Sequence, residues 1–220
     1  MEVATSVLNV EEENSIKTFY RIETAHTDYF HIDVMDGKFV ENNTIEKMKQ
    51  YSDNIKNISN IPLDVHLMVK DIKKYVDMFI PCEPRIISFH IEATKSGKET
   101  MELIKYIKEG NCKVGIAVNP ETKISEVYDY LPYIHNVLVM SVHPGKGGQK
   151  FIEETYDRIK KLKKYIEQNC FENEIEVDGG INLENVKDIN QVGADIVVAG
   201  NAVINSKDYL YTINRLKSPI

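Results

Sequence analysis

Cysteine is scarce in this sequence, and the cysteines are not arranged for cross-linking or for a thiolate metal site. Cys82, Cys112 and Cys170 are odd in number, lie far apart and form no CxxC motif. Disulfide-stabilised domains and cysteine-based zinc sites both need organised cysteine pairs. The sequence therefore predicts reduced thiols in a cytoplasmic protein.

Long apolar runs and an excess of positive charge are also missing. No segment reaches the roughly 18 consecutive apolar residues of a membrane-spanning helix. The N-terminus has neither a basic start nor a long apolar stretch. The net charge of -7 argues against a protein that binds nucleic acid. We therefore expect no membrane or nucleic-acid partner, and an anionic ligand would be held locally by backbone N–H groups.

Linkers and low-complexity segments are absent, so the chain is expected to form a single domain over residues 1–220. Its 220 residues, 42% of them hydrophobic, suffice for one large core. Asp71 and Ser96 stand before two helical stretches as expected N-caps. Strands are predicted at residues 3–8, 29–33, 63–68, 86–90, 113–118, 137–142, 174–178 and 196–199. Helices are predicted near residues 11–25, 44–57, 71–80, 96–109, 123–130, 152–169, 183–191 and 206–216.

Eight strand–helix units in one domain predict an α/β fold of the (β/α)8 TIM-barrel type. In such a barrel the C-terminal ends of all strands meet at one face. The alternative is an open doubly wound sheet, which calls for fewer strands and a glycine fingerprint after the first strand. The first predicted strand here ends in the sequence SVLN, which contains no glycine. The barrel is therefore favoured.

His31, Asp33, His66 and Asp178 lie near the ends of the second, third and seventh predicted strands. Residues two apart in a strand share a face, so His31 and Asp33 point the same way. Taken singly, each side chain has an ordinary alternative role in a buried polar pair or as a structural histidine. Because the barrel brings these strand ends together, we prefer a site for one divalent metal ion, such as zinc, iron(II) or manganese.

Other polar and sulfur-containing side chains lie on these and other predicted strands. Asp64 lies one layer deeper than His66 and is expected to form a supporting or core hydrogen bond rather than to bind metal. His90 shares a face with Ser88 on the fourth strand and is open to a catalytic or a supporting role, with support favoured. Strand methionines are usually core residues. Three methionines at strand ends are nevertheless expected to form an apolar lining that excludes water from the site. They are Met35, Met68 and Met140.

Glycine-rich loops follow the sixth, seventh and eighth predicted strands. Glycine lets backbone N–H groups approach an anion closely, and each loop leads toward a helix N-terminus. Barrels frequently bind phosphate after strands seven and eight. Ordinary strand-to-helix turns are the alternative, but three such loops at neighbouring strand ends favour phosphate binding. The residues concerned are Gly145, Lys146, Gly147, Gly148, Gly179, Gly180, Gly200 and Asn201.

Five short motifs occur in order at strand ends, and together they resemble the signatures of the ribulose-phosphate 3-epimerase family. They read HIDVMDG, DVHLM, FHIEA, MSVHPGKGGQ and EVDGG, with VAGNA following, and the resemblance extends from Ser6 to Ala202. It implies a barrel of the ribulose-phosphate-binding type with a divalent metal ion. The family interconverts D-ribulose 5-phosphate and D-xylulose 5-phosphate in the pentose phosphate pathway. It also implies a homo-oligomer, although no interface is legible in the sequence.

The resemblance implies a role for each matching residue. Asp33 and Asp178 would act as acid and base, moving a proton off carbon 3 and back onto its opposite face through a cis-enediolate. Ser6 and His66 would contact the substrate, the glycine loops would bind its phosphate, and the three methionines would surround the reacting carbon. The implied metal ligands are His31, Asp33, His66 and Asp178.

The sequence departs from the family pattern in the loops that would close over the substrate. Residues 38–43 differ from the usual sequence, Lys146 replaces a phenylalanine, and Asn9 and Asn201 replace serines. An epimerase of a hexulose phosphate such as D-allulose 6-phosphate is therefore the nearest alternative. A metal-dependent decarboxylase or aldol-type synthase is disfavoured because the second-strand sequence DVMD lacks the lysine of a DxKxxD pattern. A non-catalytic sugar-phosphate sensor would have little use for two acid/base carboxylates.

Overall fold

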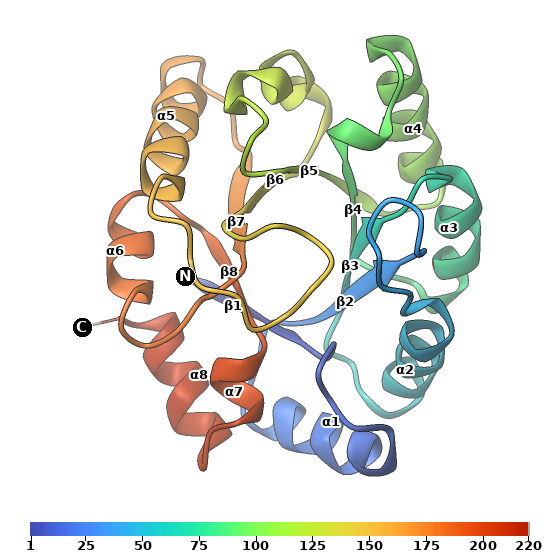
Figure 1. Ribbon diagram of the computed structural model, residues 1–220, viewed down its shortest axis with the longest axis vertical. Helices are drawn as coiled ribbons and strands as arrows, with labels where there is room; N and C mark the ends of the chain where they lie inside the picture. The colour runs from blue at the N-terminus through green and yellow to red at the C-terminus, as the bar shows by residue number, and fades with distance from the viewer. Residues whose placement is uncertain (220) are drawn as a thin grey trace.

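The computed structural model describes residues 1–219, and its eight parallel strands close into a barrel surrounded by helices (Figure 1). Each strand pairs with the next in chain order, and β8 pairs with β1. The predicted barrel is thereby confirmed, and only the last position of the predicted domain, residue 220, lies outside the described residues. The strands are β1 (Glu2–Ser6), β2 (Tyr29–Met35), β3 (Leu63–Met68), β4 (Ile86–His90), β5 (Lys113–Val118), β6 (Asn136–Met140), β7 (Glu174–Asp178) and β8 (Ile196–Ala199).

Helices form the outer ring in Figure 1, and the loop after β6 extends across the centre of the barrel in that view. The α-helices are α1 (Ser15–Thr24), α2 (Ile45–Ile58), α3 (Ile72–Phe79), α4 (Gly97–Glu109), α5 (Thr155–Gln168), α6 (Val186–Gln191), α7 (Asn201–Ile204) and α8 (Tyr209–Lys217). Four 3-10 helices complete the set: η1 (Glu12–Asn14), η2 (Ile80–Cys82), η3 (Ile91–Ala93) and η4 (Ile124–Tyr133). None of the helices in residues 1–219 combines the length and apolarity needed to cross a membrane.

Side-chain alternation along each strand separates two buried regions. On β2, Phe30, Ile32 and Val34 belong to the apolar layer between strands and helices. His31 and Asp33 alternate with them and therefore face the barrel interior. A smaller apolar cluster with members on β1, β2, β4, β5, β6 and β8 fills part of that interior. The alternation thus places polar side chains inside the barrel, where the strand ends converge.

Differences from the predicted elements occur where the chain leaves the barrel. The first strand ends at Ser6 rather than at residue 8, and the sixth ends at Met140 rather than at residue 142. After Met140, the Ser141 N–H and hydroxyl both donate to the backbone carbonyl of Asp178, each at 2.8 Å. These contacts hold Ser141 against the end of β7, and the long loop before α5 follows.

One predicted helix takes a different form, and another is preceded by a short helix that was not predicted. The helix expected near residues 123–130 is instead the 3-10 helix η4, which contains Pro132. Proline has no N–H to donate and its ring clashes with an α-helical turn, so an α-helix is disfavoured through Pro132. The last predicted helix, near residues 206–216, is α8, and the short helix α7 precedes it.

Two predicted helix caps are confirmed. The side chain of Asp71 accepts a hydrogen bond from the Lys74 N–H, and that of Ser96 accepts one from the Glu99 N–H. Each satisfies an N–H group that lacks a partner in the first turn of a helix. These caps fix the points at which α3 and α4 begin.

Candidate active site

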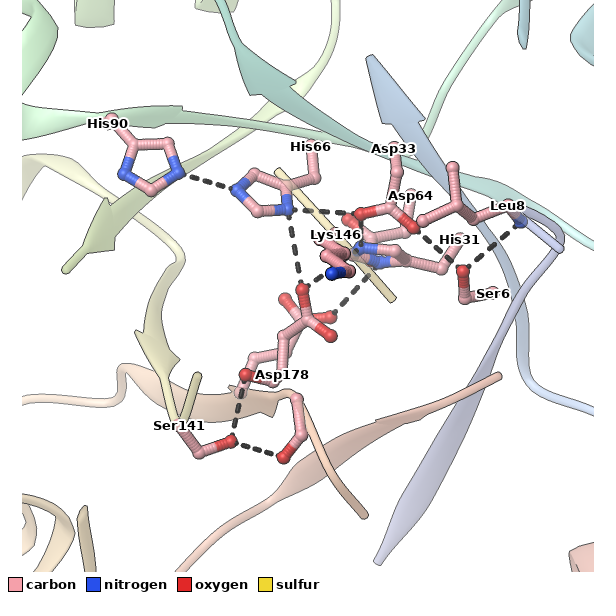
Figure 2. A network of polar contacts seen from close by, with 12 residues as sticks. Ser6, Leu8, His31, Asp33, Asp64, His66, His90, Ser141, Lys146 and Asp178 are labelled. Carbon is pink, nitrogen blue, oxygen red and sulfur yellow. Dashed lines mark hydrogen bonds and ion pairs between the residues drawn. The ribbon is translucent and has the colours of Figure 1, made fainter. Parts of the chain in front are cut away.

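Four side chains meet at the C-terminal face of the barrel, as predicted from the strand ends: His31 and Asp33 of β2, His66 of β3 and Asp178 of β7 (Figure 2). The register of adjacent strands sets Asp33 beside His66. One donor atom from each of the four residues lies within 4.8 Å of the others. Three of them are buried, and Asp178 retains partial exposure.

The two imidazoles direct nitrogen atoms at the two carboxylates. His31 Nε2 lies 3.4 Å from Asp33 Oδ1 and 3.9 Å from Asp178 Oδ2. His66 Nδ1 lies 3.4 Å and 3.5 Å from the same two oxygens. Both nitrogens are buried and have no hydrogen-bond partner within residues 1–219. Two imidazole nitrogens and two carboxylates form the donor set preferred by zinc, iron(II) and manganese, so the residues fit a divalent metal ion.

The carboxylates strongly affect the protonation of these imidazoles in the metal-free protein. Burial would lower the pKa of His31, but Asp64 and Asp33 outweigh burial and raise that pKa well above its usual value. Burial also opposes protonation of His66, but Asp178 and Asp33 raise its pKa. For Asp33, burial would raise the pKa, and His31 holds it well below its usual range. A metal ion must therefore displace protons from the imidazoles.

A buried polar cluster supports His31 from inside the barrel. Asp64 contacts the Nδ1 atom of His31, and Glu176 Oε1 lies 3.8 Å from the same nitrogen. The Asn136 side chain donates to Glu176 Oε2 at 2.7 Å. Asp64 therefore has the supporting hydrogen-bond position predicted for it, and its contact leaves Nε2 of His31 facing Asp33 and Asp178. Such contacts fix the orientation of a metal-binding imidazole.

His66 has a corresponding support on its outer side, formed by His90 and Glu92. The Nε2 atoms of His66 and His90 lie 2.8 Å apart, and His90 Nδ1 lies 3.2 Å from Glu92 Oε2. Burial, reinforced by the nearby His66, lowers the pKa of His90 to about 4. Burial would raise the pKa of Glu92, but His90, the Thr122 side chain and the Asn119 N–H lower it. His90 therefore occupies a supporting position and contacts the four converging side chains through His66.

A cavity of about 350 Å³ opens above the four side chains. Asp33 and Asp178 lie on its wall, together with Ser6, whose hydroxyl donates to Asp33 Oδ2 at 2.7 Å. The predicted methionine lining is present, since all three methionines border the cavity: Met35, Met68 and Met140. The loops after β6, β7 and β8 form the remaining wall through Gly145, Lys146, Gly147, Gly148, Gly179, Gly180, Gly200 and Asn201.

The glycine-rich loops are held close to one another by contacts that leave little room for side chains. Gly180 has a φ of +66°, and a Cβ atom there would lie 2.5 Å from the backbone nitrogen of Phe151. In the loop after β6, the Gln149 side chain donates to the carbonyls of His143 and Lys146, both at 2.7 Å. The backbone of these loops therefore borders the cavity directly.

The loop between β2 and α2, where the sequence departs from the family pattern, is anchored by Asp36. Its carboxylate accepts hydrogen bonds from the N–H groups of Lys38, Phe39 and Lys70 at 2.8–2.9 Å. The Phe39 ring packs on the imidazole of His90 with centroids 4.9 Å apart. The altered loop is thus fixed against the outer end of the His66–His90 pair.

Several residues that shape the site were not identified from the sequence. In the sequence, Glu92 is part of the motif FHIEA and Glu176 is part of EVDGG, and neither motif assigns them a role. Asn9 was noted as a departure from the family pattern, and in the structure its side-chain amide donates to Asn201 Oδ1 at 2.8 Å. A buried acidic residue two positions from a proposed ligand is the signal that could have identified Glu176.

Solved structures of other proteins share this fold. A 3-hexulose-6-phosphate synthase superposes with a TM-score of 0.72 at 13% identity, covering all of both chains. KGPDC from Streptococcus mutans superposes with a TM-score of 0.70 at 11% identity, covering 98% of this chain and 95% of that one. At these identities the likeness concerns the fold alone.

Sequence comparisons are more specific. Residues 2–204 match the profile described as the Ribulose-phosphate 3 epimerase family. The ribulose-phosphate 3-epimerase of Escherichia coli (strain K12) is 36% identical, covering 99% of this chain and 95% of that protein. The enzyme of the same name from Aquifex aeolicus (strain VF5) is 39% identical, covering 87% and 84%. With the fold and the four converging side chains, these matches establish that the chain belongs to the ribulose-phosphate 3-epimerase family of enzymes.

Proposed function

We propose that this enzyme interconverts D-ribulose 5-phosphate and D-xylulose 5-phosphate by moving the hydrogen at carbon 3. The observation that carries the proposal is the position of Asp33 and Asp178. They come from different strands to the floor of one cavity, beside two unpaired imidazole nitrogens, and glycine-rich loops form the opposite wall. This arrangement offers two proton-transfer groups and an anion-binding wall to a single small substrate.

The proposed reaction needs one base and one acid on opposite faces of carbon 3. One aspartate, as carboxylate, removes the carbon 3 proton. The C–H electron pair then forms the double bond of a cis-enediolate, and the carbonyl electrons move to the carbon 2 oxygen. The other aspartate, as carboxylic acid, returns a proton to the opposite face of carbon 3. The two residues exchange these roles in the reverse direction. Ser6 donates to Asp33 Oδ2 and thereby orients one of the two carboxylates.

We also propose that His31, Asp33, His66 and Asp178 hold one divalent ion: zinc, iron(II) or manganese. Such an ion would supply Lewis-acid stabilisation of the negative charge on the carbon 2 and carbon 3 oxygens. The chain itself holds the ligands in place, through Asp64 behind His31 and through His90 behind His66. The methionine lining excludes water from the reacting carbon without adding charge.

The phosphate is proposed to lie against the backbone N–H groups of Gly147, Gly148, Gly180, Gly200 and Asn201. Backbone donors suit this task in a chain of net charge -7, because they attract the anion without a positive surface. The four-residue helix α7 begins directly after Gly200 and adds further N–H groups at this end of the cavity. Lys146 lines the same cavity as a solvated loop residue.

A methyl group at Gly200 tests the phosphate position. Gly200 has a φ of -95°, and a Cβ atom there would contact Ser6 Cβ at 3.4 Å, so Gly200→Ala should fold normally. The methyl group would stand between Ser6 and the proposed phosphate position. We expect KM for the sugar phosphate to rise about tenfold, equivalent to about 1.4 kcal/mol, with kcat changed much less. Inhibition by inorganic phosphate should weaken by a similar factor, and an unchanged KM and phosphate inhibition would place the phosphate elsewhere.

A panel of ketose phosphates tests the substrate. We expect kcat/KM for D-ribulose 5-phosphate to exceed that for D-allulose 6-phosphate by at least about tenfold, the lower end of the effect of one extra carbon unit. The reason is that the four side chains and the glycine loops stand at a fixed separation. A six-carbon chain must bend or press on the loop of residues 38–43 or on Lys146. A higher kcat/KM for the hexulose phosphate would make this enzyme a hexulose-phosphate epimerase while leaving the proton-transfer scheme intact.

The other functions considered from the sequence are less well supported. A decarboxylase or aldol-type synthase shares the barrel, but the DVMD sequence of β2 offers no lysine to the site. A non-catalytic sensor leaves the pair of carboxylates without a purpose. The single domain over residues 1–220, the cytoplasmic location, the homo-oligomer and the pentose phosphate pathway stay predictions.

A further inference from the structure

Behind His66, a line of hydrogen-bonding groups runs from the metal position toward the outside of the barrel. His66 Nδ1 faces Asp33 and Asp178, and its other nitrogen, Nε2, lies 2.8 Å from Nε2 of His90 (Figure 2). The remaining nitrogen of His90, Nδ1, lies 3.2 Å from Glu92 Oε2. His66 and His90 are both fully buried, so water does not compete for these contacts.

The carboxylate at the end of the line is itself fixed. Its second oxygen, Glu92 Oε1, accepts a hydrogen bond from the Asn119 N–H at 2.8 Å. The carbonyl of Asn119 accepts one from Arg158 Nη2 at 2.7 Å, and Arg158 also donates to the Met140 carbonyl at 3.0 Å. Glu92 thus presents one defined oxygen to His90, and that oxygen can only accept.

These contacts determine which nitrogen atoms carry protons. Two imidazole nitrogens 2.8 Å apart share one proton, because two protons or two lone pairs would repel. Glu92 accepts, so the proton of His90 is on Nδ1 and its Nε2 is bare. His66 must then donate from Nε2, and in the neutral form its Nδ1 is bare and faces the two aspartates. If each hydrogen bond from Glu92 to His66 ran in the opposite direction, a proton would lie on His66 Nδ1, where the metal ion is proposed to bind.

We propose that His90 and Glu92 are positioning residues that select the tautomer of His66 in which Nδ1 is available as a metal ligand. The proposal rests on the metal site of the proposed function. It extends the usual pairing of a metal-binding histidine with a carboxylate by one further imidazole. Neither residue touches the substrate, and both act through His66.

Glu92→Gln is a near-isosteric test. The Asn119 N–H needs the amide oxygen of the new side chain, so the amide NH2 faces His90 Nδ1 and donates to it. The proton of His90 then moves to Nε2, and that of His66 moves to Nδ1. We expect zinc affinity, measured by competition with a chromophoric chelator, to fall by about 10- to 100-fold. Glu102→Gln removes the same charge from the exposed face of α4 and should leave affinity unchanged.

A double-variant cycle separates this role from a general loss of structure. His90→Phe keeps an aromatic ring beside Phe39 but removes the imidazole, and we expect zinc affinity to fall about tenfold. Glu92→Gln in the His90→Phe background should cause no further loss, because Glu92 acts only through His90. Additive losses, or a Glu92→Gln affinity within twofold of the unsubstituted protein, would overturn the proposal.

The tautomers themselves are measurable without activity. In ¹⁵N-histidine-labelled protein, we expect two-bond ¹⁵N–¹H correlations to show His90 protonated on Nδ1 and bare on Nε2, with or without zinc. His90→Phe identifies the signals by removing them, and Glu92→Gln should shift the proton to Nε2. If His90 of the wild-type protein is protonated on Nε2, the proposed tautomers of His90 and His66 are wrong. Failure of zinc to bind, with His90 still protonated on Nδ1, would instead count against the metal site.

Discussion

The Asp178→Asn variant is expected to lose at least about 100-fold in kcat for the epimerisation. An asparagine amide neither removes a proton from carbon nor donates one as a carboxylic acid does, and loss of one acid/base group typically costs about 10²–10⁴-fold. The fold should survive, because the backbone carbonyl of Asp178, which holds Ser141 in place, is unchanged. Circular dichroism and thermal unfolding check the fold, and a coupled assay measures kcat. Asp157→Asn, which removes a charge from the exposed face of α5, should retain full activity.

Hydrogen exchange at carbon 3 in deuterium oxide makes the role of Asp178 more specific. If Asp33 and Asp178 serve opposite faces of that carbon, the variant keeps one competent base. It should then exchange the carbon 3 hydrogen of one epimer without converting it, and Asp33→Asn should exchange only the other epimer. Both variants must be compared at equal metal content, because both residues are proposed ligands. Near-normal turnover, or exchange of both epimers by one variant, would refute the two-aspartate scheme.

The barrel and the four converging residues could be predicted because both depend on short-range patterns. Strands such as β3 (Leu63–Met68) are marked by apolar residues bounded by polar ones and proline. Once eight such strands alternate with helices, the barrel fixes where their ends meet. His31 and Asp33 were therefore placed with His66 and Asp178 without knowledge of any distance. The prediction concerned which strand ends meet, not how the side chains pair.

Pairing between side chains on different elements could not be read from the sequence. Glu92 lies beyond the end of β4, in the 3-10 helix η3 (Ile91–Ala93), so strand alternation does not predict its direction. Its second partner, Asn119, lies beyond the end of β5. The strand register is likewise a property of the closed sheet. It sets His66 beside Ser88, two residues before His90 on β4. A sequence pattern identifies polar residues in strands, whereas their partners depend on register and on loop conformation.

The helix predicted near residues 123–130 differs for a related reason. The buried residues of η4 are Ile124, Val127 and Leu131. Spacing of three residues suits a 3-10 helix as well as an α-helix, and Pro132 disfavours the α-helical form. Apolar periodicity alone therefore does not distinguish the two helix types.

Removing the divalent ion is expected to have the largest effect of all, a loss of about 10⁴-fold in kcat/KM. The Lewis-acid contribution of a catalytic ion reaches about 12 kcal/mol for a full oxyanion. About half of that is expected for the delocalised enediolate, which corresponds to about 10⁴-fold in rate. Dialysis against a chelator, followed by metal analysis and assay, measures the loss. Addition of zinc, iron(II) or manganese to the depleted protein should restore activity and identify the ion that supports the highest rate.

The chain's own residues predict how this loss depends on pH. In the metal-free protein, the carboxylates around His31 and His66 raise the pKa of both imidazoles. Protons therefore occupy the imidazoles over a wider pH range, and an ion must displace them in order to bind. Metal affinity should fall as the pH is lowered, by about tenfold per pH unit for each proton displaced, and rise as the pH is raised.

Calorimetry in buffers of different ionisation enthalpy counts the protons released on metal binding. We expect the wild-type protein to release protons when it binds the ion. The double variant His31→Gln with His66→Gln, which lacks both imidazoles, should release none and should bind the ion much more weakly. In the metal-free enzyme, His31 also holds the pKa of Asp33 well below its usual range, so Asp33 is not expected to serve as the acid. Metal affinity independent of pH would show that the ion displaces no proton from these imidazoles. Full turnover after complete depletion would show that the reaction proceeds without an ion between these four side chains.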